Sequence, residues 1–149
     1  MKQNIRDLNP SHYNETPNTG KHLICNICDI QKKEILNDIS KITDIIDIIC
    51  HYNGYDAKQS MYNRMYENVD SILGMDENGL GCTLMYILTT GYHISIHTFP
   101  DDNAIAFDLY VSSGQYNSDA DFILIYEFLV EVFEGGVFTS TYQIMERPL

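Results

Sequence analysis

Residues 91–102 read Gly91-Tyr92-His93-Ile94-Ser95-Ile96-His97-Thr98-Phe99-Pro100-Asp101-Asp102. Apolar and polar residues alternate here, as they do in an extended strand with one buried face. Ile94 and Ile96 would face the core. The polar side chains of His93, Ser95 and His97 would lie together on the opposite surface. A strand that presents two imidazoles and a hydroxyl on one face is either solvated there or part of a site, and we expect a site.

The composition indicates one globular domain that does not bind nucleic acid. The chain has 149 residues and is 44% hydrophobic, which is enough for a single core. Its formal net charge of -12 disfavours contact with a phosphate backbone, which needs clustered Lys and Arg. The acidic residues are interspersed with apolar ones rather than gathered in a stripe, so mimicry of nucleic acid is also disfavoured.

The sequence also predicts where the protein resides. Its N-terminus is polar and lacks the apolar segment of a signal peptide, and no apolar run is long enough to cross a bilayer. We therefore expect a cytoplasmic protein without a membrane partner, in which the four cysteines are reduced. Cys25 and Cys28 form a C-x-x-C pair. Residues three apart on a strand face opposite sides, so we expect no metal site there.

The remaining sequence predicts an α+β fold. Residues 1–20 are polar and aperiodic, which favours a flexible N-terminal arm ahead of a single domain, 21–149. The domain alternates strand-like and helix-like patterns in the order β-α-β-β-β-β-α-β. The predicted elements are strand 22–28, helix 33–51, strands 61–70, 81–90, 92–98 and 104–112, helix 118–133 and strand 137–146. This order favours a two-layer sandwich, with two helices on one face of a mostly antiparallel sheet.

Three segments resemble one enzyme family. They are Gly20-Lys21-His22-Leu23, His93-Ile94-Ser95-Ile96-His97-Thr98-Phe99-Pro100-Asp101 and Ala106-Phe107-Asp108-Leu109-Tyr110-Val111. From about Gly20 to its C-terminus the chain resembles the short bacterial and archaeal S-adenosylmethionine decarboxylases, whose corresponding run is close to E-S-H-I-S-I-H-T-W-P-E. These are pyruvoyl enzymes of polyamine synthesis. The resemblance implies their fold and a small-molecule adenosyl ligand.

Departures from the family pattern fall on the residues of the decarboxylation chemistry. Tyr92 stands where the family has the serine that cleaves its own chain and becomes the pyruvoyl group, and Gly91 replaces the preceding glutamate. Ser112 aligns with the family's catalytic cysteine, and a hydroxyl is a far weaker acid than a thiol. The resemblance therefore implies an uncut chain that carries no cofactor and is not a working decarboxylase.

The ligand-binding residues of the family are better retained. By resemblance, Phe99 stacks on adenine and Asp101 holds the ribose hydroxyls. The segment Tyr62-Asn63-Arg64-Met65 resembles the family segment that supplies a second stacking residue, with a soft apolar side chain in the stacking position. The further substrate-binding residues that we predict are Met65, Tyr66, Glu67 and His93.

Two functions remain open. The sulfonium of S-adenosylmethionine is already activated, and the methionine carboxylate can attack its own γ-carbon to give methylthioadenosine and homoserine lactone without a cofactor. The residues that we place at this reacting end are Tyr92, His97 and Ser112. The first hypothesis is a lyase acting on S-adenosylmethionine or on a conjugate such as SAM-AMP, an activity known in phages and antiviral defence systems. The alternative is a catalytically dead S-adenosylmethionine-binding sensor, or a regulatory partner of an active decarboxylase.

Two further expectations concern assembly and metals. The resemblance implies a homo-oligomer, a dimer or a trimer, with sites between subunits. A metal site built from His93, His97 and either Asp101 or Asp102 is disfavoured, because side chains four residues apart on a strand are too distant for easy chelation. We therefore predict no metal.

Overall fold

The computed structural model describes residues 19–65, 81–89, 92–112, 114 and 118–148. The strands are β1 (Thr19–Ile27), β2 (Ala57–Met65), β3 (Gly81–Leu88), β4 (His93–Phe99), β5 (Ala104–Ser112) and β6 (Thr141–Pro148). The helices are α2 (Ile39–Asn53) and α4 (Asp119–Phe133), with short 3-10 helices η2 (Lys33–Asn37) and η3 (Pro100–Asp102). The order of strands and α-helices is the predicted β-α-β-β-β-β-α-β.

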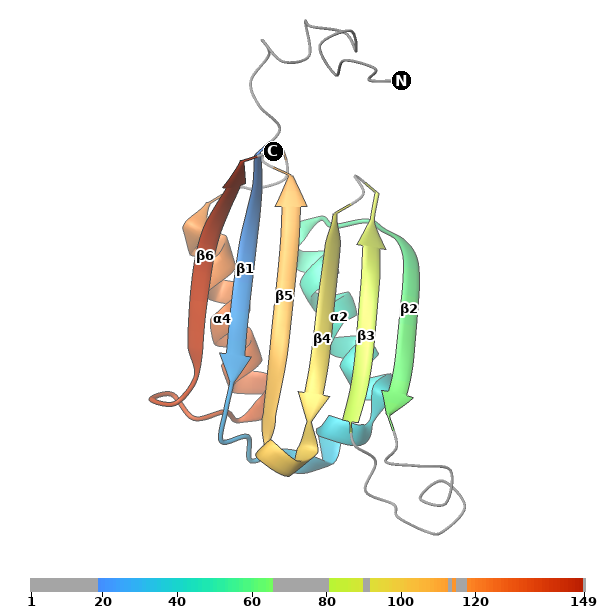
Figure 1. The fold of residues 1–149 in the computed structure, drawn as a ribbon, viewed down its shortest axis with the longest axis vertical. Coiled ribbons are helices and arrows are strands. Elements are labelled where there is room, and N and C mark those ends of the chain that lie inside the picture. Colours follow the sequence, from blue (N-terminus) through green and yellow to red (C-terminus); the bar gives the residue numbers. More distant parts are fainter. Residues whose placement is uncertain (1–18, 66–80, 90–91, 113, 115–117, 149) are drawn as a thin grey trace, which may run out of the picture.

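All six strands belong to one sheet, in the order β2-β3-β4-β5-β1-β6. Every pair of neighbouring strands is antiparallel. Both α-helices lie against the same face of the sheet, and no helix among the described residues covers the other face, which we call the open face (Figure 1). The predicted α+β fold, a two-layer sandwich with two helices on one face, is therefore confirmed.

The first helix begins later than its apolar periodicity predicts. Residues 33–37 form η2 rather than the first turn of the helix. Asp38, in an extended conformation, accepts a hydrogen bond at 3.2 Å from the backbone N–H of Lys41 and so caps α2. The helix ends at Asn53 and is capped by Gly54, whose left-handed conformation (φ 67°) suits a residue without a Cβ.

Two strand boundaries also differ from those expected. The last strand begins at Thr141 rather than at residue 137, because residues 137–140 form a turn in which the Ser140 N–H donates to the Gly136 carbonyl at 3.0 Å. Strand β2 begins at Ala57, and residues 66–70 of the predicted strand lie outside the described residues. The first strand begins at Thr19. Residues 1–18 also lie outside the described residues, so the division into arm and domain stays a prediction.

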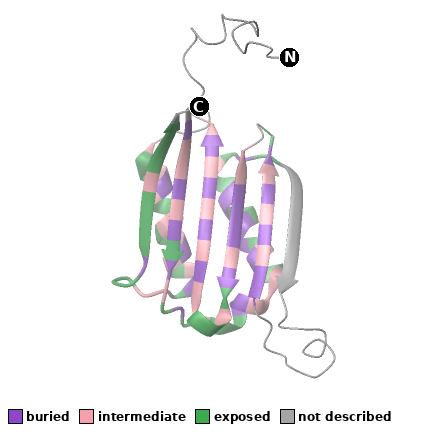
Figure 2. Ribbon diagram, viewed as in Figure 1, coloured by how far each residue is buried: buried purple, intermediate pink, exposed green. Residues whose placement is uncertain are grey.

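The core lies between the sheet and the two helices. Along β3 and β5 buried residues alternate with half-buried ones, which appears as bands on the ribbon, and β4 follows this pattern except that Ser95 is buried as well (Figure 2). Every second residue therefore points at the helices, as the period of a strand requires. The helices contribute one buried face each, namely Ile42, Ile45, Ile46 and Ile49 of α2 and Phe122, Ile125, Leu129 and Phe133 of α4.

One buried hydroxyl ties η2 to the end of β4. Thr98 donates its Oγ1–H to the Leu36 carbonyl at 2.5 Å and accepts from the Cys82 N–H at 2.7 Å. Gly81 precedes this contact with φ 116°, and a Cβ there would collide with the Thr98 carbonyl. These contacts hold the strand end that carries Phe99. In the described part of the chain, no helix is long and apolar enough to cross a membrane.

Candidate functional site

The open face of the sheet carries the polar residues of β4. Ile94 and Ile96 are buried under the helices, so His93, Ser95 and His97 project from the opposite face. This arrangement is the one that the alternation predicts. The open face is also where strands far apart in the sequence add further polar and aromatic side chains.

Tyr110 is the centre of an aromatic cluster at one end of this face. Its ring centroid lies 4.8 Å from that of Tyr92, 5.7 Å from that of His22 and 5.9 Å from that of His93. The guanidinium carbon of Arg147 lies 5.8 Å from the same centroid, within the range of a cation–π contact. We call these five residues the Tyr110 cluster. They come from β1, β4, β5, β6 and the residue before β4.

The sequence makes room for this cluster at Gly20. A Cβ at this position would collide with the ring of Tyr110, so the glycine leaves the space that the ring occupies. The Tyr110 hydroxyl oxygen is buried and finds no hydrogen-bond partner among the described residues. A buried hydroxyl without a partner costs roughly 1–3 kcal/mol, so such a group suggests that something else completes the site.

Histidine and carboxylate groups surround the cluster. His22 Nε2 lies 3.1 Å from Asp108 Oδ1, a distance that suits a hydrogen bond or an ion pair. The pKa of His93 is lowered, first because burial disfavours its charged form and then because His22 is close, and the Asp108 carboxylate only partly opposes this. His93 therefore favours its neutral form, whereas the pair of His22 and Asp108 supplies a donor and an acceptor.

His97 and Ser95 lie on the middle of the open face. The Nδ1 atom of His97 is 3.0 Å from the Thr83 hydroxyl on β3. Ser95 is 6% exposed, with Met85 and Asp108 as its register partners on either side. His97 thus has a partner within the sheet, and this contact explains its position without a ligand.

Phe99 and Asp101 lie at the other end of β4. Phe99 is 40% exposed and Asp101 is exposed in η3, the turn that joins β4 to β5. Six residue steps separate Phe99 from His93, which corresponds to about 20 Å along a strand. Ser112 pairs with Gly20 and so lies at the Tyr110 end. One copy of the chain therefore places Tyr92 and Ser112 at the opposite end of the sheet from Phe99 and Asp101, whereas His97 lies two residues from Phe99.

Of the remaining predicted binding residues, the structure describes the backbone of Met65. Met65 ends β2 and pairs with Gly81, so its backbone lies at the same end of the sheet as Phe99. Tyr66 and Glu67 lie outside the described residues. Two cavities in the described part of the chain lie along the helices, and neither is lined by Phe99 or Asp101.

No metal centre emerges from the described residues. They contain no group of three or more His, Cys, Asp or Glu side chains placed to hold an ion. The four cysteines all lie in the described residues and form no disulfide; burial raises the pKa of Cys25 to about 12, with the nearby Asp108 carboxylate adding to the effect. A thiol of that kind stays protonated and unreactive.

Four members of this site were not singled out from the sequence. His22, Asp108, Tyr110 and Arg147 come together only because β1 lies between β5 and β6. The alternation of Asp108 and Tyr110 with apolar neighbours already placed both on the polar face of their strand. Which strands flank that face is not contained in the pattern of any one strand.

Comparisons with known proteins show which family has this fold. The family model described as S-adenosylmethionine decarboxylase matches residues 21–143. The chain belongs to the S-adenosylmethionine decarboxylase family. The crystal structure of the adenosylmethionine decarboxylase from Aquifex aeolicus is similar in fold, with a TM-score of 0.66 and 16% sequence identity over 90% of this chain and 94% of that one. No curated protein matches the sequence.

The range matched by the S-adenosylmethionine decarboxylase family model covers most of the Tyr110 cluster. The family match begins at Lys21 and ends at Gln143, and it includes His22, Tyr92, His93 and Tyr110. Arg147 lies beyond the matched residues. The family match and the similar structure therefore establish the fold, whereas the cluster and its activity have to be argued from the residues themselves.

Proposed function

We propose that this chain is a cofactor-free lyase that cleaves S-adenosylmethionine, or a nucleotide conjugate of it such as SAM-AMP, to methylthioadenosine (or its conjugate) and homoserine lactone. The observation that carries the proposal is the buried, unpartnered hydroxyl of Tyr110, set among aromatic rings and one guanidinium. Such a group is expected where a polar ligand completes the hydrogen bonding.

The cluster suits the methionine end of the substrate. A sulfonium is a cation, and the faces of Tyr92 and Tyr110 attract cations at short range. The Arg147 guanidinium can hold one oxygen of the methionine carboxylate while the other oxygen is free to attack. The pair of His22 and Asp108 offers an acceptor for the substrate ammonium group.

The reaction needs positioning rather than a protein nucleophile. A carboxylate oxygen forms a bond to the γ-carbon, the bond from this carbon to sulfur breaks, and its electron pair stays on sulfur. The products are a neutral thioether and a lactone, so no proton, oxidant or second substrate enters the balance. Aligning the carboxylate behind the breaking bond is the contribution that a rigid site makes to such an intramolecular step.

Decarboxylation is disfavoured by the residue at position 92. A pyruvoyl group derives from a serine whose hydroxymethyl attacks the preceding carbonyl, and a phenol cannot be converted into that group. Ser112 likewise offers no thiol as a proton donor. We therefore propose that the chain remains uncut and carries no prosthetic group.

The proposed site needs a second copy of the chain. Phe99 and Asp101 are about 20 Å from His93 along β4, so one copy cannot hold the adenosine end and the reacting end together unless the ligand lies along the strand. Two copies that face each other across their open sheets, with strands running in opposite directions, would bring Phe99 of one copy opposite the Tyr110 cluster of the other. We propose a homo-oligomer, most simply a dimer, of this kind.

The test is incubation of the purified full chain with S-adenosylmethionine or SAM-AMP, followed by chromatography and mass spectrometry. Methylthioadenosine, or its conjugate, and homoserine lactone should appear in equal amounts, and the protein should show one uncut mass. Tyr92→Leu should slow product formation by about 10- to 30-fold through the loss of an aromatic face. Intact substrate at high protein concentration, or two protein fragments split before Tyr92, would count against the proposal.

A second candidate function follows from the separation of the two ends. The exposed ring of Phe99 and the carboxylate of Asp101 could hold an adenosine without engaging the Tyr110 cluster. This would be a sensor, or a regulatory partner of an active decarboxylase. Saturable binding of S-adenosylmethionine by calorimetry, with the ligand recovered unchanged, would favour this function over the lyase.

A further inference from the structure

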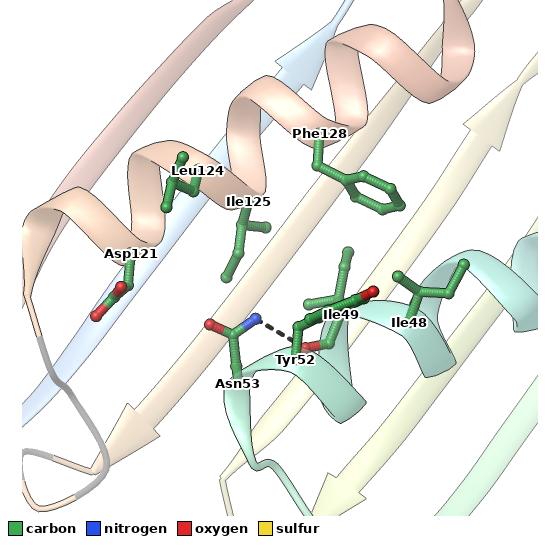
Figure 3. A pocket seen from close by; sticks show the side chains of 8 residues that line it. All are labelled: Ile48, Ile49, Tyr52, Asn53, Asp121, Leu124, Ile125 and Phe128. Carbon is green, nitrogen blue, oxygen red and sulfur yellow. Dashed lines mark hydrogen bonds between the residues drawn. The ribbon is translucent and has the colours of Figure 1, made fainter.

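A groove between the two helices has no part in the proposed lyase site. It runs along α2 and α4 on the helix layer, has a volume of about 350 Å³, and shares no residue with the Tyr110 cluster or with the Phe99 end of β4 (Figure 3). This volume lies at the lower end of the range of small-molecule sites.

The walls of the groove are apolar and open to solvent. Ile48 and Tyr52 lie one turn apart on α2, and Leu124 and Phe128 lie one turn apart on α4. Tyr52 is 82% exposed and Leu124 is 60% exposed. A helix normally turns its apolar residues inward, so these side chains form a surface that an apolar group would cover with a gain in free energy.

One end of the groove is polar and negatively charged. Asp121 is the one charged residue among those that line the groove. Its Oδ2 accepts a hydrogen bond from the Ser118 hydroxyl at 3.1 Å, which leaves Oδ1 without a donor among the described residues. Asn53 donates its Nδ2–H to the Ile49 carbonyl at 2.8 Å, and its amide oxygen turns toward Asp121 (Figure 3). Two acceptors therefore face the same end.

The field of Asp121 also reaches the interior below this end. The pKa of Tyr55 is raised to about 12, chiefly by burial and next by the Asp121 carboxylate. A negative charge that faces a partly apolar groove attracts a positive group more strongly than the same charge in open water. The lining offers no cationic side chain that could neutralise it instead.

We infer that this groove binds a small organic cation with an apolar body, such as an arylalkyl ammonium, whose ring packs between Tyr52 and Leu124 and whose ammonium group donates to Asp121 and Asn53. The volume of the groove suits a ligand of this size. Its apolar walls suit the ring of the ligand, and its negative end suits the ammonium group. The inference does not depend on the proposed lyase activity.

Two probes of equal shape and opposite charge test this inference. The ¹⁵N-labelled full chain is titrated with phenethylammonium or with 3-phenylpropionate in buffered salt, and amide shifts are followed by NMR. Phenethylammonium should shift the amides of Tyr52, Asn53 and Leu124 along a saturable curve. The anion should bind about tenfold more weakly or not at all, because it cannot donate to the acceptors and meets a like charge.

Matched variants separate the groove from the general acidity of the chain. Asp121→Asn should remove most of the preference for the cation. Asp119→Asn changes the net charge equally in the same helical turn but lies outside the lining, and it should leave the preference unchanged. Leu124→Ala should weaken both probes in parallel, because it removes apolar contact only. A dispersed spectrum for each variant shows that it is folded.

Three outcomes would overturn the inference. The first is equal binding of cation and anion, and the second is an equal loss of preference in the Asp119→Asn and Asp121→Asn variants. The third is a groove already covered by a second copy of the chain, in which case neither probe shifts its amides and Leu124→Glu halves the mass measured by light scattering.

Discussion

The two faces of the sheet use the same strands for different purposes. On the face toward the helices, Phe107, Leu109 and Val111 are fully buried and apolar. On the open face, the next residues along, Asp108 and Tyr110, are half-buried and join polar or aromatic partners from other strands. Because successive side chains alternate, one strand can hold the fold together and carry a site at once. The effects of substitutions on the two faces should therefore differ in kind, stability on one face and ligand binding or activity on the other, as well as in magnitude.

The largest expected effect is loss of stability on the helix face. Phe107→Ala removes a fully buried ring and should lower the free energy of unfolding by about 3–5 kcal/mol, because a cavity remains. Denaturation by urea measures the change. Asp108→Asn, one residue along and on the open face, keeps an acceptor for His22 and should change stability by less than about 1 kcal/mol. An equal loss of unfolding free energy in the two variants would mean that the two faces of the sheet are equally buried.

The next effect concerns ligand binding at the far end of β4. Phe99→Ala should weaken the binding of S-adenosylmethionine by about tenfold, because it removes an aromatic surface on which the adenine can stack. Calorimetry measures the affinity. Phe138→Ala is the matched control, since Phe138 is fully exposed in the turn before β6 and is not part of the proposed site. Identical affinities in the two variants would contradict the role of Phe99.

Tyr110→Phe distinguishes a hydroxyl kept for a ligand from one kept for the fold. It removes a buried hydroxyl without a partner, so the ligand-free chain should become more stable by about 1 kcal/mol while product formation falls. Thermal unfolding and chromatography measure the two effects. Tyr52→Phe, on an exposed residue of α2, should leave both unchanged. A less stable Tyr110→Phe variant would show that the hydroxyl has a partner in the folded protein.

The smallest effect is the pH dependence contributed by His93. Its pKa in the folded chain is lowered from the ordinary value of 6.5, so the neutral form is favoured on folding and protonation favours the unfolded chain. This part of the stability is complete above pH 6.5 and is lost as the pH falls from there through the lowered folded pKa. Unfolding temperatures of the wild type between about pH 7.5 and about pH 5 should fall more steeply than those of His93→Gln. If the unfolding temperatures of the two proteins fell in parallel with pH, the contribution of His93 would be contradicted.

The elements of the fold could be predicted because their patterns are local. The alternation in 92–98 and the three- and four-residue spacing of Ile42, Ile46 and Ile49 each specify an element without reference to the rest of the chain. The boundaries were less predictable. Helix α2 starts late because Asp38 caps it, and β6 starts late because residues 137–140 turn, and both depend on backbone contacts that hydrophobic spacing does not reveal.

The candidate site was predictable only where it follows one strand. The alternation placed His93, Ser95 and His97 on one face, and the family resemblance drew attention to Tyr92 and Phe99. Neither signal could show that Tyr92 and Phe99 lie at opposite ends of that face. Whether two residues of one strand can share a site becomes clear only once the length of the strand and its neighbours in the sheet are known.

Local periodicity was thus enough to predict the order of the strands and α-helices, the two-layer architecture and the polar face of β4. The neighbours of that face were set by the sheet, which inserts β1 between β5 and β6 and brings His22 to Asp108 across 86 positions of sequence. The physical reason is that side-chain direction follows from backbone geometry within one element, whereas strand order follows from how all the elements bury their apolar faces together.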